Sequence, residues 1–290
     1  MINKIGIIGA GQMGNGIAHV SALAGYKIIL IDISQAAIDK GMAAIKKNLT
    51  RQVKKEKITQ DAMDKALANI CSDASAKALA DVDLLIEAAT ENFELKVKIF
   101  ADALQYVKAE CLFATNTSSL SITKLAATTD RPEKFIGLHF MNPVPVMKLV
   151  ELIKGLATSQ EMFETSKKFA ESVGKIVAVS EDFPGFIANR ILMPMLNEAI
   201  YTLFEGVGDV QSIDTVMKLG MAHPMGPLQL ADFIGLDTCL AIMNVLHEGF
   251  GDSKYRPCPL LIKYVEAGWL GVKSGKGFYD YSGVEPVPTR

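Results

Sequence analysis

Short apolar runs alternate with longer stretches of helical periodicity along the first 180 residues. An apolar run bounded by turn-forming residues is typical of a buried strand, whereas apolar residues that recur every three or four positions predict a helix. The expected strands are residues 5–8, 28–31, 83–88, 112–115, 135–140, 147–153 and 175–179, and the expected helices are 13–23, 34–57, 94–104 and 159–173. This alternation predicts an α/β fold with a mainly parallel sheet.

The pattern becomes helical throughout after a turn at Pro184 and Gly185. Helical periodicity continues through residue 205, and no strand-like alternation is obvious beyond it; further helices are expected at 210–219, 227–247 and 260–267. We therefore expect a doubly wound, Rossmann-type domain over residues 1–183 and an all-helical C-terminal domain over residues 184–290. The proline- and valine-rich end, residues 283–290, is expected to be poorly ordered.

The composition argues against several classes of protein. Of the 290 residues, 49% are hydrophobic and 21% are charged, as in ordinary soluble proteins. A net charge of −2 argues against a general nucleic-acid binder. No run reaches the ~18 uninterrupted apolar residues of a membrane span, and glycines interrupt the first apolar segment, so no signal peptide is expected.

The cysteines and the other metal-binding residue types form no recognisable cluster in the sequence. Four cysteines, Cys71, Cys111, Cys239 and Cys258, are widely spaced and include no CxxC pair. We expect them to be buried free thiols in a reducing cytoplasm. No group of residues has metal-ligand spacing, so no metal is expected.

The segment from Lys4 to Asp32 carries the strongest motif in the chain, KIGIIGAGQMGNGIAHVSALAGYKIILID. The order strand, glycine turn, helix, strand and acid is that of a dinucleotide-binding βαβ unit. Gly9 allows a tight turn, Gly11 allows a pyrophosphate to approach the backbone, and Gly14 allows the helix to pack closely on the sheet. The helix N-terminus would then face the phosphates.

Asp32 follows the second strand of this unit, about 20 residues after the glycines, as the dinucleotide fingerprint requires. Its carboxylate would accept hydrogen bonds from the ribose hydroxyls of the adenosine. A carboxylate at this position also repels a 2′-phosphate, which favours NAD over NADP.

Polar residues follow or interrupt several of the later strands. Ala88 to Glu91 and Asn116 to Ser118 lie beyond carboxyl ends of strands, where ligands bind in doubly wound sheets, so we expect them to face cofactor and substrate. His139 and Glu151 lie inside two apolar runs joined by a proline-containing turn, which could set them side by side as a catalytic pair. The alternatives are that His139 is a buried core residue with its hydrogen bonds made inside the protein, and that the polar segments are ordinary loop residues.

A basic stretch, AIKKNLTRQVKKEK, ends the second helix. Arg51 and Lys55 are four residues apart and share one helix face. The pair is either a solvated helix surface or a clamp for the phosphates of a ligand.

With these residues in view, the chain resembles the 3-hydroxyacyl-CoA dehydrogenases, and among them the short bacterial 3-hydroxybutyryl-CoA dehydrogenases. The resemblance covers nearly the whole chain and is carried by GAGQMGNGIA, EAATEN, ATNTSSLSIT, GLHFMNPVPVMKLVE, DFPGFIANRI, AHPMGPLQLADFIGLD and KSGKGFYDY. It implies the reversible, NAD-dependent conversion of an (S)-3-hydroxyacyl-CoA, such as 3-hydroxybutyryl-CoA, into a 3-ketoacyl-CoA such as acetoacetyl-CoA, in fatty-acid or butyrate metabolism.

The resemblance also assigns roles to individual positions. His139 matches the catalytic histidine, Glu151 its paired carboxylate, and Ser118 and Asn189 the residues that contact the reacting end of the substrate. Arg51 and Lys55 match the positions that hold the phosphates of coenzyme A. The expected cofactor contacts, which include the glycine loop, are Gly9, Gly11, Gln12, Met13, Gly14, Asp32, Ala88, Glu91, Lys96, Asn116, Ser118 and Asn142.

The resemblance further implies a homodimer or higher homo-oligomer built through the helical domain, which is also expected to contribute to substrate binding. Two other functions remain open from the sequence: a 3-hydroxyacid dehydrogenase that acts on free acids, and a non-catalytic NAD-binding or structural protein on the same fold. Neither nucleic acid nor membrane is an expected partner.

Overall fold

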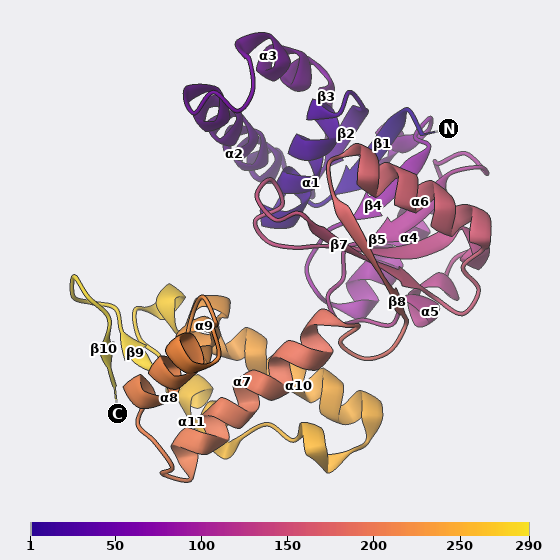
Figure 1. Cartoon of the computed structure of the whole chain (residues 1–290). Coiled ribbons are helices and arrows are strands. Elements are labelled where there is room, and N and C mark those ends of the chain that lie inside the picture. The colour runs from indigo at the N-terminus through magenta and orange to yellow at the C-terminus, as the bar shows by residue number, and fades with distance from the viewer. Residues whose placement is uncertain (1, 290) are drawn as a thin grey trace. The chain divides into compact units, whose positions relative to one another are not determined.

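The computed structural model describes residues 2–289 and divides into two compact units, Met1–Phe183 and Pro184–Arg290 (Figure 1). In the first unit, one eight-stranded sheet has the strand order β3-β2-β1-β4-β5-β6-β7-β8. Its strands are β1 Lys4–Ile8, β2 Lys27–Ile31, β3 Ile70–Asp73, β4 Leu84–Glu87, β5 Leu112–Thr115, β6 Phe135–Phe140, β7 Leu149–Lys154 and β8 Ile176–Glu181. All neighbouring strands are parallel except β6 and β7. The expected Rossmann-type, mainly parallel sheet is confirmed.

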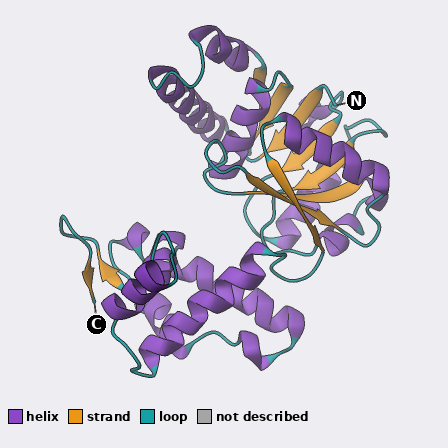
Figure 2. Cartoon of the chain, viewed as in Figure 1, coloured by secondary structure: helices purple, strands orange, loops and turns teal. Residues whose placement is uncertain are grey.

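Helices cover both faces of this sheet (Figure 2): α1 Gln12–Leu23, α2 Gln35–Lys54, α3 Gln60–Ala68, α4 Phe93–Leu104, α5 Ile122–Ala126 and α6 Gln160–Ser172. Successive strand residues point to opposite faces, and β5 shows the consequence. Ala114 belongs to the core that includes residues of α1 and α6. Its neighbour Phe113 instead stacks on Phe100 of α4, with ring centroids 5.6 Å apart.

Three short elements of the first unit, strand β3 and helices α3 and α5, were not expected. Strand β3 lies at the edge of the sheet, and only Ile70 of its four residues is buried, so it has no apolar run. Helices α3 and α5 have nine and five residues, too few for a clear periodic pattern. The N-caps do carry a local signal: Thr59 and Ser121 each accept a hydrogen bond from the backbone N–H three residues on.

The second unit is built mainly from helices: α7 Ala188–Phe204, α8 Val210–Thr215, α9 Pro227–Ile234, α10 Leu236–Phe250 and α11 Pro259–Glu266. A single helix over 227–247 was expected, and this expectation is wrong. The chain breaks at Gly235, whose φ of +103° a helix cannot contain, and α9 and α10 meet at a bend of 96°. Within residues 2–289 no single helix has the length and apolar content to cross a membrane; the bent pair α9–α10 meets that test by length and composition only.

Two buried carboxylates tie the end of the chain to this helical unit. Asp232 accepts hydrogen bonds from the backbone N–H groups of Phe278 and Tyr279, both at 2.9 Å. Asp214 accepts from the backbone of Leu228 and Gln229 in the first turn of α9, and from the hydroxyl of Tyr279 at 2.8 Å. Buried carboxylates require such partners, so these bonds fix the C-terminal segment.

Two further expectations are corrected. Strand β10 (Val287–Pro288) pairs antiparallel with β9 (Tyr279–Asp280), and Thr289 donates its backbone N–H to Phe278, so the end of the chain through Thr289 is ordered. Cys71 is exposed on the edge strand β3, while Cys111, Cys239 and Cys258 are buried free thiols as expected.

His19 of α1 is a buried histidine with incomplete hydrogen bonding. Its side chain lies 3.4 Å from Gln52 of α2 through Nε2, and its Nδ1 has no partner among residues 2–289. Burial, with a smaller contribution from the charge of Lys175, lowers the pKa of His19 to about 4 even though the bond to Gln52 opposes this. His19 is therefore neutral in the folded protein at ordinary pH.

We expect the first unit to lose stability as the pH falls from 6.5 to 4. The unfolded chain takes up a proton at His19 near its ordinary pKa of 6.5, whereas the folded protein takes it up only near pH 4, so protons favour the unfolded state in this window. The loss is about 3 kcal/mol. The His19→Gln variant should lack this part of the acid destabilisation. Urea unfolding measures it, with hydrogen exchange of the sheet amides as the readout for the first unit. The control is His247→Gln in α10, and a wild-type pH dependence in His19→Gln would contradict the assignment.

Candidate active site

The glycine loop joins β1 to α1 and is shaped by close backbone contacts. Gly9 has a φ of +103°, and a Cβ there would lie 2.6 Å from the carbonyl oxygen of Ala88. A Cβ on Gly14 would overlap the carbonyl oxygen of Gly9. A Cβ on Gly11, in contrast, would meet no atom within 4 Å. Protein packing therefore explains Gly9 and Gly14, and the open space at Gly11 fits the approach of a ligand to the backbone.

Asp32 lies directly after β2, on the wall of a cavity of about 390 Å³ that the glycine loop also lines. Its Oδ2 accepts from the backbone N–H of Ala10 at 2.6 Å and its Oδ1 from that of Ile33 at 2.7 Å. These bonds fix the carboxylate beside the loop. Ala88 and Thr90 line the same cavity from the end of β4.

Residues expected to contact the cofactor are also linked to one another beyond this cavity. Gln12 donates from Nε2 to Oδ1 of Asn142 at 3.0 Å, which joins the start of α1 to the segment after β6. Met13 packs against the core of the unit. Asn116, at the end of β5, accepts from the backbone N–H of Phe140 at 2.9 Å. The turn after β5 is thereby fixed to the last residue of β6.

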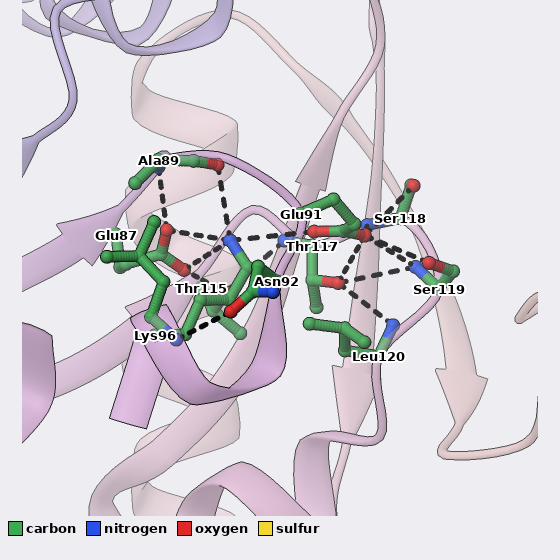
Figure 3. A network of polar contacts seen from close by, with 11 residues as sticks. Glu87, Ala89, Glu91, Asn92, Lys96, Thr115, Thr117, Ser118, Ser119 and Leu120 are labelled. Carbon is green, nitrogen blue, oxygen red and sulfur yellow. Dashed lines mark hydrogen bonds and ion pairs between the residues drawn. The ribbon is translucent and has the colours of Figure 1, made fainter. Parts of the chain in front are cut away.

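The turns after β4 and β5 form one polar network (Figure 3). Lys96 is 1% exposed and donates to both carboxylate oxygens of Glu87, at 2.7 and 2.8 Å. Glu91 accepts from the backbone N–H of Ser118 at 2.9 Å. Ala88, Glu91, Asn116 and Ser118 thus lie at adjacent carboxyl ends of strands, while Lys96 lies inside the protein beneath them.

His139 and Glu151 are directly opposite each other in the antiparallel pair β6–β7. Nδ1 of His139 lies 2.8 Å from Oε2 of Glu151, and the two residues are 8% and 1% exposed. Side chains at opposite positions of an antiparallel pair point to the same face, and the buried carboxylate needs a partner. The structure therefore brings the two residues together.

The basic residues of α2 line a second cavity of the first unit, with a volume of about 660 Å³. Arg51 and Lys55 contribute one wall, and the sequence interpretation missed three further cations of the lining, Lys57, Lys148 and Lys175. Lys175 is 8% exposed and donates to the carbonyl oxygens of Val144 and Met147, at 2.5 and 2.8 Å. Lys57 belongs to the same basic stretch as Arg51 and Lys55, whereas Lys148 and Lys175 come from distant segments that spacing alone could not have grouped with them.

Asn189, the other expected substrate contact, belongs to the second unit. It is the second residue of α7 and is 8% exposed. Within residues 2–289, no group of three or more histidine, cysteine, aspartate or glutamate side chains has the arrangement of a metal site.

Comparison with known proteins identifies the family of both units. Residues 4–183 match the model of the 3-hydroxyacyl-CoA dehydrogenase NAD binding domain, and residues 185–281 match the C-terminal domain of the same family. The chain belongs to the 3-hydroxyacyl-CoA dehydrogenase family. The expected family is confirmed, and NAD is the cofactor of its first domain.

Individual relatives are similar along their full length. A 3-hydroxybutyryl-CoA dehydrogenase of Bradyrhizobium diazoefficiens is 64% identical, over 100% of this chain and 99% of that protein. The human mitochondrial hydroxyacyl-coenzyme A dehydrogenase is 40% identical, over 97% of this chain and 92% of that one. The crystal structure of (S)-3-hydroxybutyryl-CoA dehydrogenase from Ralstonia eutropha has a TM-score of 0.96 at 50% identity, over 98% of this chain and 100% of that one.

Proposed function

We propose that this enzyme interconverts (S)-3-hydroxybutyryl-CoA and acetoacetyl-CoA with NAD as the redox partner. The observation that carries the proposal is the buried His139–Glu151 pair, 2.8 Å apart, on the sheet that bears the glycine loop and Asp32. The names of the relatives, at up to 64% identity over the full chain among those described above, supply the substrate. NAD supplies the acceptor for the hydride from C3, so the protein itself has to handle one proton at the C3 oxygen.

His139 is the proposed general acid and base. Its Nδ1 is engaged with Glu151, and we assign to Nε2 the transfer of the proton, from the C3 hydroxyl in oxidation and back to the C3 oxygen in reduction. Glu151 holds the ring in one tautomer and stabilises the imidazolium that forms. The reaction needs no nucleophile, because no covalent intermediate is required.

Ser118 and Asn189 are proposed to orient the reacting end of the substrate. The support for Ser118 is its position after β5, in the turn that Asn116 fixes to β6 next to His139. Hydroxyl and amide groups donate hydrogen bonds to a carbonyl oxygen, and such positioning brings C3 into a reactive geometry.

The basic cavity is the proposed binding site for the phosphates of coenzyme A. Arg51, in the last turn of α2, and Lys55, its C-cap residue, are both exposed, and Lys57, Lys148 and Lys175 add positive charge to the same lining. Phosphate groups bind where several cations converge. A coenzyme A ester is therefore favoured over a free acid, which would leave this cavity unused.

His139→Gln should lower kcat by roughly 10²–10⁴ and leave NADH binding intact, because the proton-transfer group is lost while the glycine loop is unchanged. Glu151→Gln should lower kcat less and change its pH dependence. NADH absorbance with acetoacetyl-CoA measures kcat, and NADH fluorescence measures binding. Near-normal kcat in His139→Gln would remove the assignment, and equal turnover of free acetoacetate by the wild type would remove the proposed substrate.

Arg51→Ala combined with Lys55→Ala should raise KM for acetoacetyl-CoA by about tenfold or more. KM for a short acetoacetyl-pantetheine analogue should change little, because that substrate has no phosphates to bind. The matched control is Lys46→Ala combined with Lys54→Ala, which removes two exposed charges of α2 outside the cavity lining. Equal increases for both substrates would show that Arg51 and Lys55 form only a solvated surface.

We also propose that the helical unit associates with a second copy of the chain. Phe204, Val207, Val216 and Leu219 are 50%, 75%, 59% and 81% exposed. Val207 and Val216 border an apolar cavity of about 490 Å³ between α7 and α8. Exposed apolar side chains at the border of an apolar cavity, as Val207 and Val216 are, mark association surfaces.

Sedimentation velocity at micromolar concentration should give a dimer or larger assembly for the wild type. Val216→Glu with Leu219→Glu should shift it toward the monomer, because two charges would be buried at the interface. Val284→Glu, at a fully exposed position in another part of the unit, should not. A monomeric wild type would contradict the proposal.

A further inference from the structure

One glutamine in the lining of the basic cavity contacts a buried residue that lies outside that lining. Gln52 lines the cavity from α2, between Arg51 and Lys55. Its amide oxygen Oε1 lies 3.4 Å from Nε2 of His19 in α1, and His19 is 1% exposed. Val20, the next residue of α1, also lines the cavity. The contact therefore joins the wall of the cavity to the interior of the first unit.

The partner of this contact determines which ring nitrogen of His19 carries the proton. The oxygen of an amide only accepts hydrogen bonds, so the ring nitrogen that faces it, Nε2, is the donor. Burial lowers the pKa of His19 to about 4, so at neutral pH the ring holds one proton and Nδ1 holds none. Nδ1 is also the nitrogen without a partner among residues 2–289. This agrees with the assignment, because buried donors without a partner are rarer than buried acceptors without one.

The same contact orients the amide group of Gln52. An amide carries its acceptor and its two donors on different atoms. Oε1 can therefore bond His19 while both N–H groups of Nε2 stay available to another molecule. Among residues 2–289, no protein group accepts a hydrogen bond from this Nε2. The donors of Gln52 are thus left for the cavity that the side chain lines.

The rest of the lining suits an anion. Among the residues that the structure describes, the lining includes no carboxylate, and its cations are Arg51, Lys55, Lys57, Lys148 and Lys175. A further cation among them would be repelled by its neighbours. An amide N–H instead adds a hydrogen-bond donor without adding charge.

We propose that Gln52 donates a hydrogen bond from Nε2 to a phosphate group of coenzyme A, and that His19 is a positioning residue that holds the amide in the donating orientation. The inference rests on the proposed role of the basic cavity in binding these phosphates. Its basis is the division of the Gln52 amide between a buried partner at Oε1 and the cavity at Nε2. His19 acts on substrate binding only through Gln52.

The test compares KM and kcat for acetoacetyl-CoA with those for the short acetoacetyl-pantetheine analogue, at low and at high KCl concentration. Gln52→Met keeps the length of the side chain and removes its hydrogen-bonding groups. It is combined with His19→Leu in a double-mutant cycle. Arg51→Ala serves as the charged comparison. The matched control is Gln35→Met, which replaces an exposed glutamine of the same helix outside the cavity lining.

Gln52→Met should raise KM for acetoacetyl-CoA by about tenfold, the effect of one hydrogen bond to a charged group. Its kcat, and its KM for the pantetheine substrate, should change by less than about twofold. The factor should be similar at both salt concentrations because no charge is lost, whereas the factor for Arg51→Ala should shrink at high salt. His19→Leu should raise KM for acetoacetyl-CoA by about threefold, and by nothing further in the Gln52→Met background. Gln35→Met should match the wild type.

Three results would overturn the inference. The first is an unchanged KM for acetoacetyl-CoA in Gln52→Met, or an equal rise for both substrates. The second is a Gln52→Met factor that shrinks with salt as that of Arg51→Ala does, because a displaced α2 would weaken the contacts of Arg51 and Lys55. The third is an undiminished effect of His19→Leu in the Gln52→Met background. Turnover of acetoacetyl-CoA by the wild type would still support the proposed function in each case, and only its absence would contradict that function.

Discussion

The reversal of strand β7 is the constraint on which the His139–Glu151 pair depends. In a parallel sheet, the residues near the ligand-binding edge come from the carboxyl ends of strands. Strand β7 runs opposite to β6, so Glu151, near the start of β7, lies beside His139, near the end of β6. A parallel β7 would carry the start of the strand to the far edge of the sheet. The antiparallel pair thus places a buried carboxylate beside the histidine near the end of β6, and each of the two is a hydrogen-bond partner of the other.

Among residues 2–289, other buried ionisable groups also have hydrogen-bond partners, whereas His19 is only partly bonded. Lys96 with Glu87, and Asp232 with the backbone of the C-terminal segment, are fully enclosed and fully bonded. Burial still raises the pKa of Asp232 to about 6, against the hydrogen bonds from Phe278 and Tyr279 that lower it. His19 is the exception, because it is buried with one ring nitrogen unbonded among the described residues. Lys96, Glu87 and Asp232 are structural anchors, whereas His19 makes the first unit sensitive to acid.

The sequence was sufficient to predict those elements whose side chains are buried in a regular pattern. Strands β5 and β6 begin and end where expected because every residue from Phe113 to Thr115 and along β6 is buried. Edge strand β3 was missed because its side chains are mostly exposed. The helix expected over 227–247 was wrong because one backbone angle, at Gly235, decides the break, and helical periodicity does not report it.

In the candidate site, too, the residues that were predicted lie close together in the sequence, whereas the contacts that were missed join distant segments. The glycine loop and Asp32 were predicted because the whole motif lies within one βαβ unit. Lys175 was missed because its neighbours in the sequence give no sign that it reaches two carbonyl groups of a distant segment. Glu91 was expected to contact the cofactor by resemblance, but its five donors in the turn after β5 could not be read from spacing.

The connection between β6 and β7 contacts both the start of α1, beside the glycine loop, and the basic cavity. Asn142, at its start, accepts a hydrogen bond from Gln12 beside the glycine loop. Farther along, Val144 packs so closely on α1 that a Cβ on Gly16 would lie 2.8 Å from its side chain. The end of the connection lines the basic cavity through Lys148, and Lys175 bonds two of its carbonyl groups. The same segment that reverses β7, and so pairs His139 with Glu151, therefore also contacts the start of α1 through Asn142 and lines the basic cavity through Lys148.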